Sequence, residues 1–126
     1  MMSGLRHFPL RFEAAYAALS SLFFIRPEDS SIEVDQAIVH VRMGWGFRCT
    51  FPKSAVRFTA RAKDVLLTRG VHGWRGRWLV NGSGDNLVTI GLDPDQTAHV
   101  LGIAVTLREL TVSVDDPDAL AEALLE

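Results

Sequence analysis

The chain has 126 residues, of which 48% are hydrophobic and 22% are charged, and its formal net charge is −2. This composition is typical of a globular domain and excludes a disordered segment and a collagen-like repeat; a single cysteine, Cys49, also excludes a disulfide scaffold. No repeat or linker divides the sequence, so we expect one domain over residues 1–126. Within it we expect a strand and a helix in 1–31, a β-sheet in 32–114 and a C-terminal helix in 115–126.

The charged residues are distributed unevenly along the chain. Residues 1–41 contain three arginines and five acids, residues 42–77 contain seven arginines, two lysines and one acid, and residues 78–126 contain one arginine and nine acids. The middle block indicates either a basic surface for an anionic partner or the solvent-facing sides of consecutive strands. We expect outer strand faces, away from the acidic C-terminal helix, for four arginines: Arg42, Arg48, Arg57 and Arg61.

The first elements are a short strand and a helix. Apolar side chains alternate over Phe8–Phe12, which is the spacing of a strand. In Glu13–Phe24 they recur every three or four residues, which predicts an amphipathic helix that ends before Pro27. The apolar run Ala14–Ile25 has 12 residues, fewer than the roughly 20 that span a bilayer, and no cleavage-site pattern follows it. We therefore expect no transmembrane segment and a cytoplasmic protein.

An alternating pattern begins at Ile32 and predicts consecutive strands. Residues 37–43 and 47–51 are the expected arms of a hairpin, with Gly44-Trp45-Gly46 as its turn. Cys49 falls on the apolar side of the second arm, so we interpret it as a small buried hydrophobe and not as a nucleophile. Residues 56–61 predict a third strand with Phe58 facing inward.

The second half of the chain contains further strand signals. We expect a strand over Trp74–Val80 and another over Leu87–Leu92, joined as a hairpin by the glycine- and asparagine-rich loop 81–86. Asp93-Pro94-Asp95 predicts a turn, and residues 103–114 predict one or two more strands.

The chain closes with a predicted helix. Asp116 before Pro117 is typical of an N-cap, and Leu120 and Leu124 supply a narrow apolar stripe. The pattern as a whole predicts a mainly β (α+β) fold. We expect a strongly bent antiparallel sheet or small barrel with an early helix and a C-terminal capping helix.

Two segments carry a resemblance to known proteins. Leu110–Asp118, which reads LTVSVDDPD and leads into Leu120 and Leu124, resembles the closing strand and capping helix of bacterial pleckstrin-homology-like domains. Gly70–Ser83 is similar to a signature of small uncharacterised actinobacterial proteins. The resemblance covers residues 32–126 and implies a PH-like barrel. It implies no single function, because this fold carries lipid binders, peptide binders and assembly modules.

The sequence shows no recognisable catalytic or cofactor motif. The four histidines are not at zinc-ligand spacing, and the glycine-rich stretches form neither a dinucleotide fingerprint nor a phosphate-binding loop. The acids beside the prolines are explained by turn and cap chemistry. We therefore expect no metal and no cofactor, and we favour a non-enzymatic role.

The densest cluster of specialised side chains lies in residues 72–81. Two interpretations remain open for it: a tryptophan core flanked by two solvent-facing arginines, and a recognition strand. In both, Trp74 and Trp78 share one strand face with Gly76 between them, and the two arginines share the other. In the second interpretation the binding residues are His72, Arg75, Arg77 and Asn81.

Three functional hypotheses follow. We favour a binding or assembly module that acts through its basic strands on a protein or an anionic small molecule. The alternative is a barrel that carries a small apolar or anionic ligand. A third is an enzyme of unrecognised type that uses His72 with Asp85. An isoelectric point near 6.1 argues against nucleic acid as the principal partner.

Overall fold

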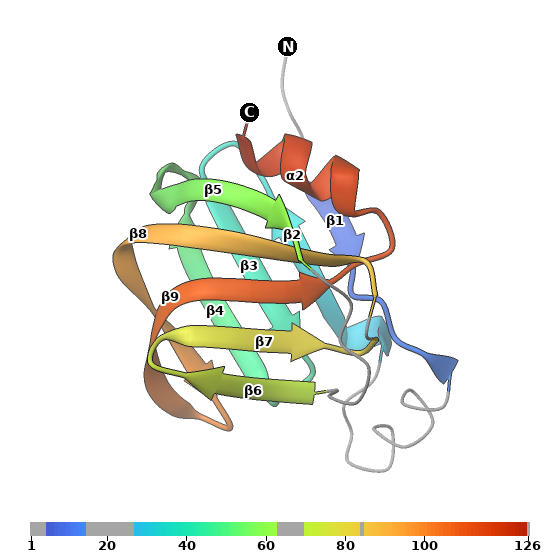
Figure 1. Ribbon diagram of the computed structural model, residues 1–126, viewed down its shortest axis with the longest axis horizontal. Coiled ribbons are helices and arrows are strands. Elements are labelled where there is room, and N and C mark those ends of the chain that lie inside the picture. The colour runs from blue at the N-terminus through green and yellow to red at the C-terminus, as the bar shows by residue number, and fades with distance from the viewer. Residues whose placement is uncertain (1–4, 15–26, 63–69, 84, 126) are drawn as a thin grey trace.

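A computed structural model of the protein describes residues 5–14, 27–62, 70–83 and 85–125. Its described strands are β1 (Arg6–Pro9), β2 (Ser30–Val34), β3 (Ile38–Met43), β4 (Phe47–Pro52), β5 (Val56–Arg61), β6 (Gly70–Trp74), β7 (Arg77–Asn81), β8 (Leu87–Val100) and β9 (Ile103–Ser113). Short 3-10 turns lie at Pro27–Asp29 and Lys53–Ala55, and the C-terminal helix is α2 (Pro117–Leu125). The strand order is β1-β2-β3-β4-β8-β9-β7-β6, with β5 paired to β8 beside this path (Figure 1).

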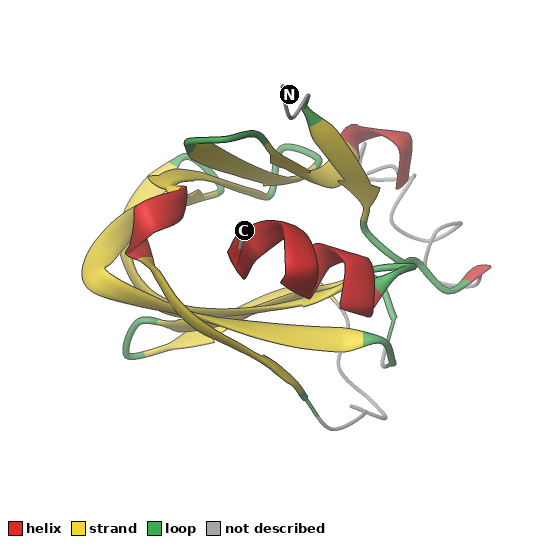
Figure 2. Cartoon of the chain, turned by 90° about the horizontal axis from the view of Figure 1, so that it is seen from above, coloured by secondary structure: helices red, strands yellow, loops and turns green. Residues whose placement is uncertain are grey.

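The sheet curls into an open half-barrel because β8, its longest strand, bends and pairs with β5 at one end and with β4 at the other. Residues 88–91 of β8 lie between β5 and β9, whereas residues 98–100 lie between β4 and β9. Seen from above, the sheet bends around α2, which lies in the concave side (Figure 2). A mainly β fold with a strongly bent sheet and a C-terminal capping helix is thus confirmed.

The β3–β4 hairpin follows the predicted alternation. Val41 pairs with Cys49 and Met43 with Phe47, and all four side chains are buried. The residues between them face solvent, because successive strand residues point to opposite sides of a sheet. The expected burial of Cys49 is confirmed, and burial raises the pKa of its thiol to about 12.

The predicted turn at Asp93-Pro94-Asp95 is wrong. These residues lie within β8, where the pairing with β9 passes from Gly91↔Glu109 to Gln96↔Leu107. The strand therefore uses five steps where its partner uses two, which is a bulge. The bulge bends β8 without reversing its direction. Asp93-Pro94-Asp95 therefore marks the place where β8 leaves β5 and continues toward β4.

The predicted strand over Trp74–Val80 is also wrong, because the chain turns back within it. Arg75 and Gly76 have φ angles of 52° and 83°, the left-handed pair of a tight two-residue hairpin turn between β6 and β7. Gly76 suits this turn because it lacks a Cβ. Trp74 pairs with Arg77 and Trp78 with Gly73, so the two tryptophans lie on different arms.

The loop 81–86 does not join two neighbouring strands as the expected hairpin would. Strand β9 lies between β7 and β8, and it pairs in parallel with β7, from Arg77↔Glu109 to Val80↔Val112. Among the described strands this is the one parallel pair, and an isolated parallel bridge joins Phe12 to Gly82. Sequence signals for a turn cannot reveal a strand inserted from 20 or more residues downstream.

Strand β5 departs from its predicted alternation. Its register against β8 shifts between Val56 and Phe58, and Phe58 lies exposed on the outer side instead of in the core. There its ring covers Gly91, the residue paired with it on β8, and a Cβ at position 91 would overlap the ring unless the ring moved.

Helix α2 closes the concave side as expected. The Oδ1 atom of Asp116 accepts a hydrogen bond from the backbone N–H of Ala119 at 3.2 Å, the contact of an N-cap. Leu120 and Leu124 are buried in the core. The early helix expected over Glu13–Phe24 lies largely outside the described residues. In the described parts of the chain, no helix is long and apolar enough to cross a membrane.

Candidate functional site

The four residues predicted to form one surface site lie on the β6–β7 hairpin, and the structure buries one of them, Asn81. Arg75 lies exposed in the β6–β7 turn, and Arg77 lies exposed at the start of β7 with its Nε 3.9 Å from a carboxylate oxygen of Glu109. Asn81 is buried at the end of β7, where its Nδ2 donates to the carbonyl of Ser83 at 2.8 Å. The side chain of His72 lies outside the described part of the structure. Binding by His72, Arg75 and Arg77 stays a prediction, whereas Asn81 belongs to the interior.

Asp85 belongs to a group of hydrogen-bonded polar residues that ties the N-terminal segment to the ends of β7 and β9. We call this group, Arg11, Ser83, Asp85 and Ser113, the polar latch. The Oδ1 of Asp85 accepts hydrogen bonds from Arg11 Nε and from Ser83 Oγ, both at 2.7 Å. Nearby, Ser113 Oγ donates to the carbonyl of Arg11 at 2.8 Å. The hydrogen bond from Arg11 holds the pKa of the Asp85 carboxyl below its usual range. An ionised carboxylate with these partners is a structural anchor and a weak candidate for a general base.

Most arginines on the outer faces are matched by an acid. Carboxylates lie within 3.9 Å of five described arginines: Arg11, Arg57, Arg61, Arg77 and Arg108. The partner of Arg61 is Asp118 of α2, at 3.7 Å, so the arginine-rich segment 42–77 and the acidic helix are in contact there. The expectation that all four strand arginines lie away from that helix is therefore wrong for Arg61. Arg42 and Arg48 differ, since within the described residues neither forms an ion pair with a carboxylate.

Arg42 and Arg48 belong to a row of basic residues that crosses three strands. Arg42 of β3 is registered with Arg48 of β4, and Arg48 with His99 of β8. We call these three residues the cation row. All three side chains are exposed, and Arg42 Nε donates to the carbonyl of Asp29 at 3.1 Å. Among the residues that the structure describes, none is hydrogen-bonded to the side chain of Arg48 or His99.

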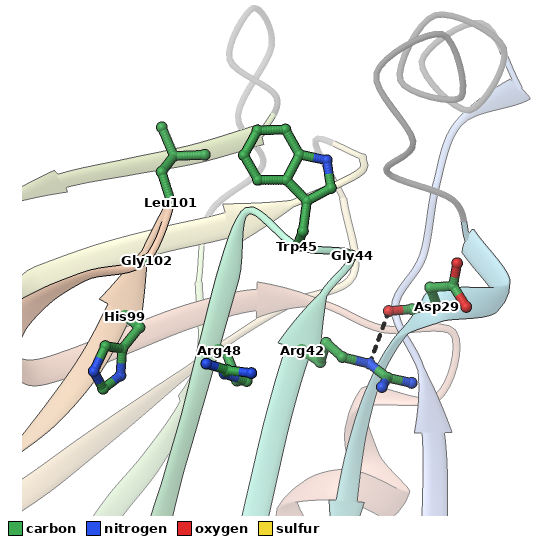
Figure 3. Close-up of a pocket in the computed structure, with 8 residues that line it drawn as sticks. All are labelled: Asp29, Arg42, Gly44, Trp45, Arg48, His99, Leu101 and Gly102. Carbon is green, nitrogen blue, oxygen red and sulfur yellow. Dashed lines mark hydrogen bonds between the residues drawn. The ribbon is translucent and has the colours of Figure 1, made fainter.

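A shallow pocket of about 630 Å³ lies over the cation row (Figure 3). It is lined by Asp29, Arg42, Gly44, Trp45, Arg48, His99, Leu101 and Gly102. Two hairpin turns form its outer edge, and they are joined by a hydrogen bond from the Leu101 N–H to the Gly46 carbonyl at 3.1 Å. The Asp29 carboxylate points away from Arg48 and His99 (Figure 3).

This arrangement is suited to binding an anion. Guanidinium and imidazolium groups donate charge-assisted hydrogen bonds to phosphates and carboxylates. Cys49, at the strand position next to Arg48, is buried with a raised thiol pKa and is therefore a poor nucleophile. In the described ranges, no three histidine, cysteine or acidic side chains are grouped closely enough to hold a metal ion.

The sequence contained part of the signal for this site. Arg42 and Arg48 lie three residues before and three residues after Trp45, so a hairpin centred there places both on one face. His99 carried no comparable signal. It reaches Arg48 only through the pairing of β4 with β8, strands whose register depends on the distant bulge at Asp93-Pro94-Asp95.

Comparison with known proteins gives no relative from which a role could be taken: no family model, curated protein or solved structure matches this chain.

Proposed function

We propose that this protein is a non-enzymatic binding module that recognises an anionic group on its partner with the cation row. The observation that carries the proposal is the absence of a matching carboxylate, among the described residues, beside Arg42 and Arg48, when five other arginines have one. Like charges directly opposite one another destabilise a sheet. An anion bound over the row would relieve that repulsion and make charge-assisted hydrogen bonds in exchange.

The concave side of the half-barrel gives less support to the ligand-carrier hypothesis. It is filled by large buried side chains, among them Phe47, Phe51 and Leu107, and by Leu120 of α2. The enzyme hypothesis is weakened by the commitment of Asp85 to Arg11 and Ser83. The pocket over the cation row is the feature that remains for binding.

The proposal is tested by chromatography on immobilised heparin, used as a general polyanion. We expect the wild-type protein to be retained at low salt and to elute as salt screens the contacts. Arg42→Glu with Arg48→Glu should abolish retention. Arg57→Glu with Arg61→Glu changes the net charge equally on exposed arginines that have acidic partners, and it should leave most of the retention in place.

Equal effects of the two double variants would show that retention reflects overall charge, and would overturn the proposal. So would a wild-type protein that passes through the column at low salt. Circular dichroism of each variant establishes that the sheet is intact.

A further inference from the structure

Exposed apolar side chains gather at the two turns that border the cation row. Trp45 in the β3–β4 turn is 57% exposed, as is Leu101 in the β8–β9 turn, and Ile103 beside it is 68% exposed. We call these three residues the apolar tips. Figure 3 shows Trp45 and Leu101 extending past the strand ends, away from Arg48 and His99. Isolated exposed hydrophobic residues are common, but a group on two joined turns marks an interaction surface.

The backbone at Leu101 has a conformation that is unfavourable for an apolar side chain. Leu101 has a φ angle of 52° and Gly102 one of 82°, and the flanking Val100 and Ile103 are paired. This is a two-residue hairpin turn, whose first position is usually Asn, Asp or Gly because a left-handed backbone is unfavourable for a bulky residue. Leucine is thus a poor choice for folding here, and its exposure gives no packing benefit in return.

The spacing between the apolar tips and the cation row fits a membrane interface. Arg42 and Arg48 are each three residues from Trp45, and His99 is two residues from Leu101. At about 3.3 Å per strand residue the basic groups lie up to roughly 10 Å behind the tips. Apolar groups of surface-bound proteins enter the bilayer by about 5–10 Å, which leaves the cations among the lipid headgroups. Tryptophan favours this interfacial region.

The charge at the other end of the molecule favours the same orientation. Helix α2 lies at the top of Figure 1 and the β8–β9 turn at the bottom. The helix and its N-cap carry the exposed acids Asp116, Asp118 and Glu122. An anionic surface attracts the end with the cation row and repels the end with these acids, so the apolar tips face the lipid.

From these features we infer that the apolar tips and the cation row together dock on an anionic lipid bilayer. The tips insert between headgroups, and Arg42, Arg48 and His99 contact lipid phosphates and carboxylates. This inference rests on the proposed function, since it names the partner of the same site.

The test measures sedimentation of the full chain with phosphatidylcholine vesicles that contain or lack phosphatidylserine. We expect binding to the anionic vesicles and at least about tenfold weaker binding to the neutral ones, as electrostatic attraction adds to apolar insertion. Leu101→Asn with Ile103→Thr should weaken vesicle binding about tenfold while folding stability is kept or raised, because asparagine suits the left-handed turn. Leu125→Asn, an exposed leucine on α2, is the matched control and should bind as wild type does.

A second measurement tests whether the side chain of Trp45 enters the bilayer. Trp45→Phe keeps an apolar tip and should still bind, but it should lose most of the vesicle-induced blue shift of tryptophan emission. Unchanged binding by the Leu101/Ile103 variant, or an unchanged shift in Trp45→Phe, overturns insertion of the tips. If the wild-type protein is retained on heparin but does not bind vesicles, the membrane is not the partner, and the proposed anion-binding function is unaffected. If it binds neither, the proposed function itself is overturned.

Discussion

Arg48 lies between two basic neighbours, and this placement has a cost for the free protein. It faces Arg42 on one side and His99 on the other, in direct register. The directly opposed charges of Arg42 and Arg48 weaken the sheet, and among the described residues neither arginine forms an ion pair with an acid. Residues that reduce stability while remaining accessible are typical of binding sites.

Replacing Arg48 by threonine should therefore stabilise the fold. We expect a gain of about 0.5 kcal/mol in the free energy of unfolding, because the repulsion is removed and threonine favours strands. The gain should shrink as salt is added, since the opposed charges are exposed and screened. Urea unfolding at low and high salt measures both effects.

Arg57→Thr is the control for this change, because Arg57 is exposed on a strand but has Asp93 at 3.4 Å. It should leave stability unchanged or slightly reduced. A loss of stability in Arg48→Thr that is the same at every salt concentration would show that the arginine stem packs favourably, and that repulsion along the row is unimportant.

At the level of elements, β5 is held against β8 partly by an aromatic contact on the outer face. Phe58 pairs with Gly91, and its ring occupies the space that a Cβ on Gly91 would need. A glycine in a strand is usually unfavourable, but here an aromatic neighbour covers the exposed backbone.

Gly91→Ala should destabilise the protein by about 1–3 kcal/mol, the usual cost of forcing an extra group into an occupied space. The same change in a Phe58→Ala background should cost little, since the ring is gone. Denaturant unfolding of the two single variants and the double variant measures the coupling. Additive losses would show that Gly91 is required for its backbone and not for the ring above it.

Elements with local signals were predicted well, and those with distant partners were not. The β3–β4 hairpin and the capped helix α2 follow from alternation and from Asp116-Pro117, because their partners lie nearby in the chain or on one core-facing stripe. The bulge in β8 was predicted as a turn, since a proline between two acids is common to both. The tight turn at Arg75-Gly76 has only a single glycine as a signal, so the alternating residues around it predict a continuous strand.

The candidate site, like the fold, is predicted by the sequence only where the signal is local. The alternating pattern of the β3–β4 hairpin predicts that Arg42 and Arg48 face outward, which the structure confirms, whereas the predicted surface position of Asn81 is wrong because the fold buries it. Asn81-Gly82 is a pair typical of an exposed turn, but Asn81 lies in the interior and donates to the carbonyl of Ser83. His99 joins the row only through the register of β8.

At the scale of the whole molecule, the polar latch joins the beginning of the chain to its end. Arg11 contacts both Asp85 and Asp115, and Ser113 accepts from the Gly82 N–H while donating to the Arg11 carbonyl. Each contact spans a large sequence separation, so the latch fixes the N-terminal segment across the ends of β7 and β9.

Asp85→Asn should lower stability at neutral pH by about 1 kcal/mol or less, because the carboxylate is about half exposed and its ion pair is partly screened. The folded state lowers the pKa of Asp85, so its contribution is complete above the unfolded-state value near 4 and is lost as pH falls through the lower folded value. The gap between wild type and variant should thus be constant from neutral pH to about pH 5 and close below about pH 4. A gap that persists at the lowest pH would assign the effect to packing.

The parallel pairing of β7 with β9 has a consequence for the order in which the protein can be built. The β6–β7 hairpin is complete at Asn81, yet the strand it docks against begins only at Ile103. At a synthesis rate of about 5–20 residues per second, the hairpin leaves the ribosome a second or more before its neighbour exists. During that interval its inner edge is open to other chains. Nascent polypeptides that end before β9 therefore present an unpaired strand edge, the feature through which β-sheets aggregate.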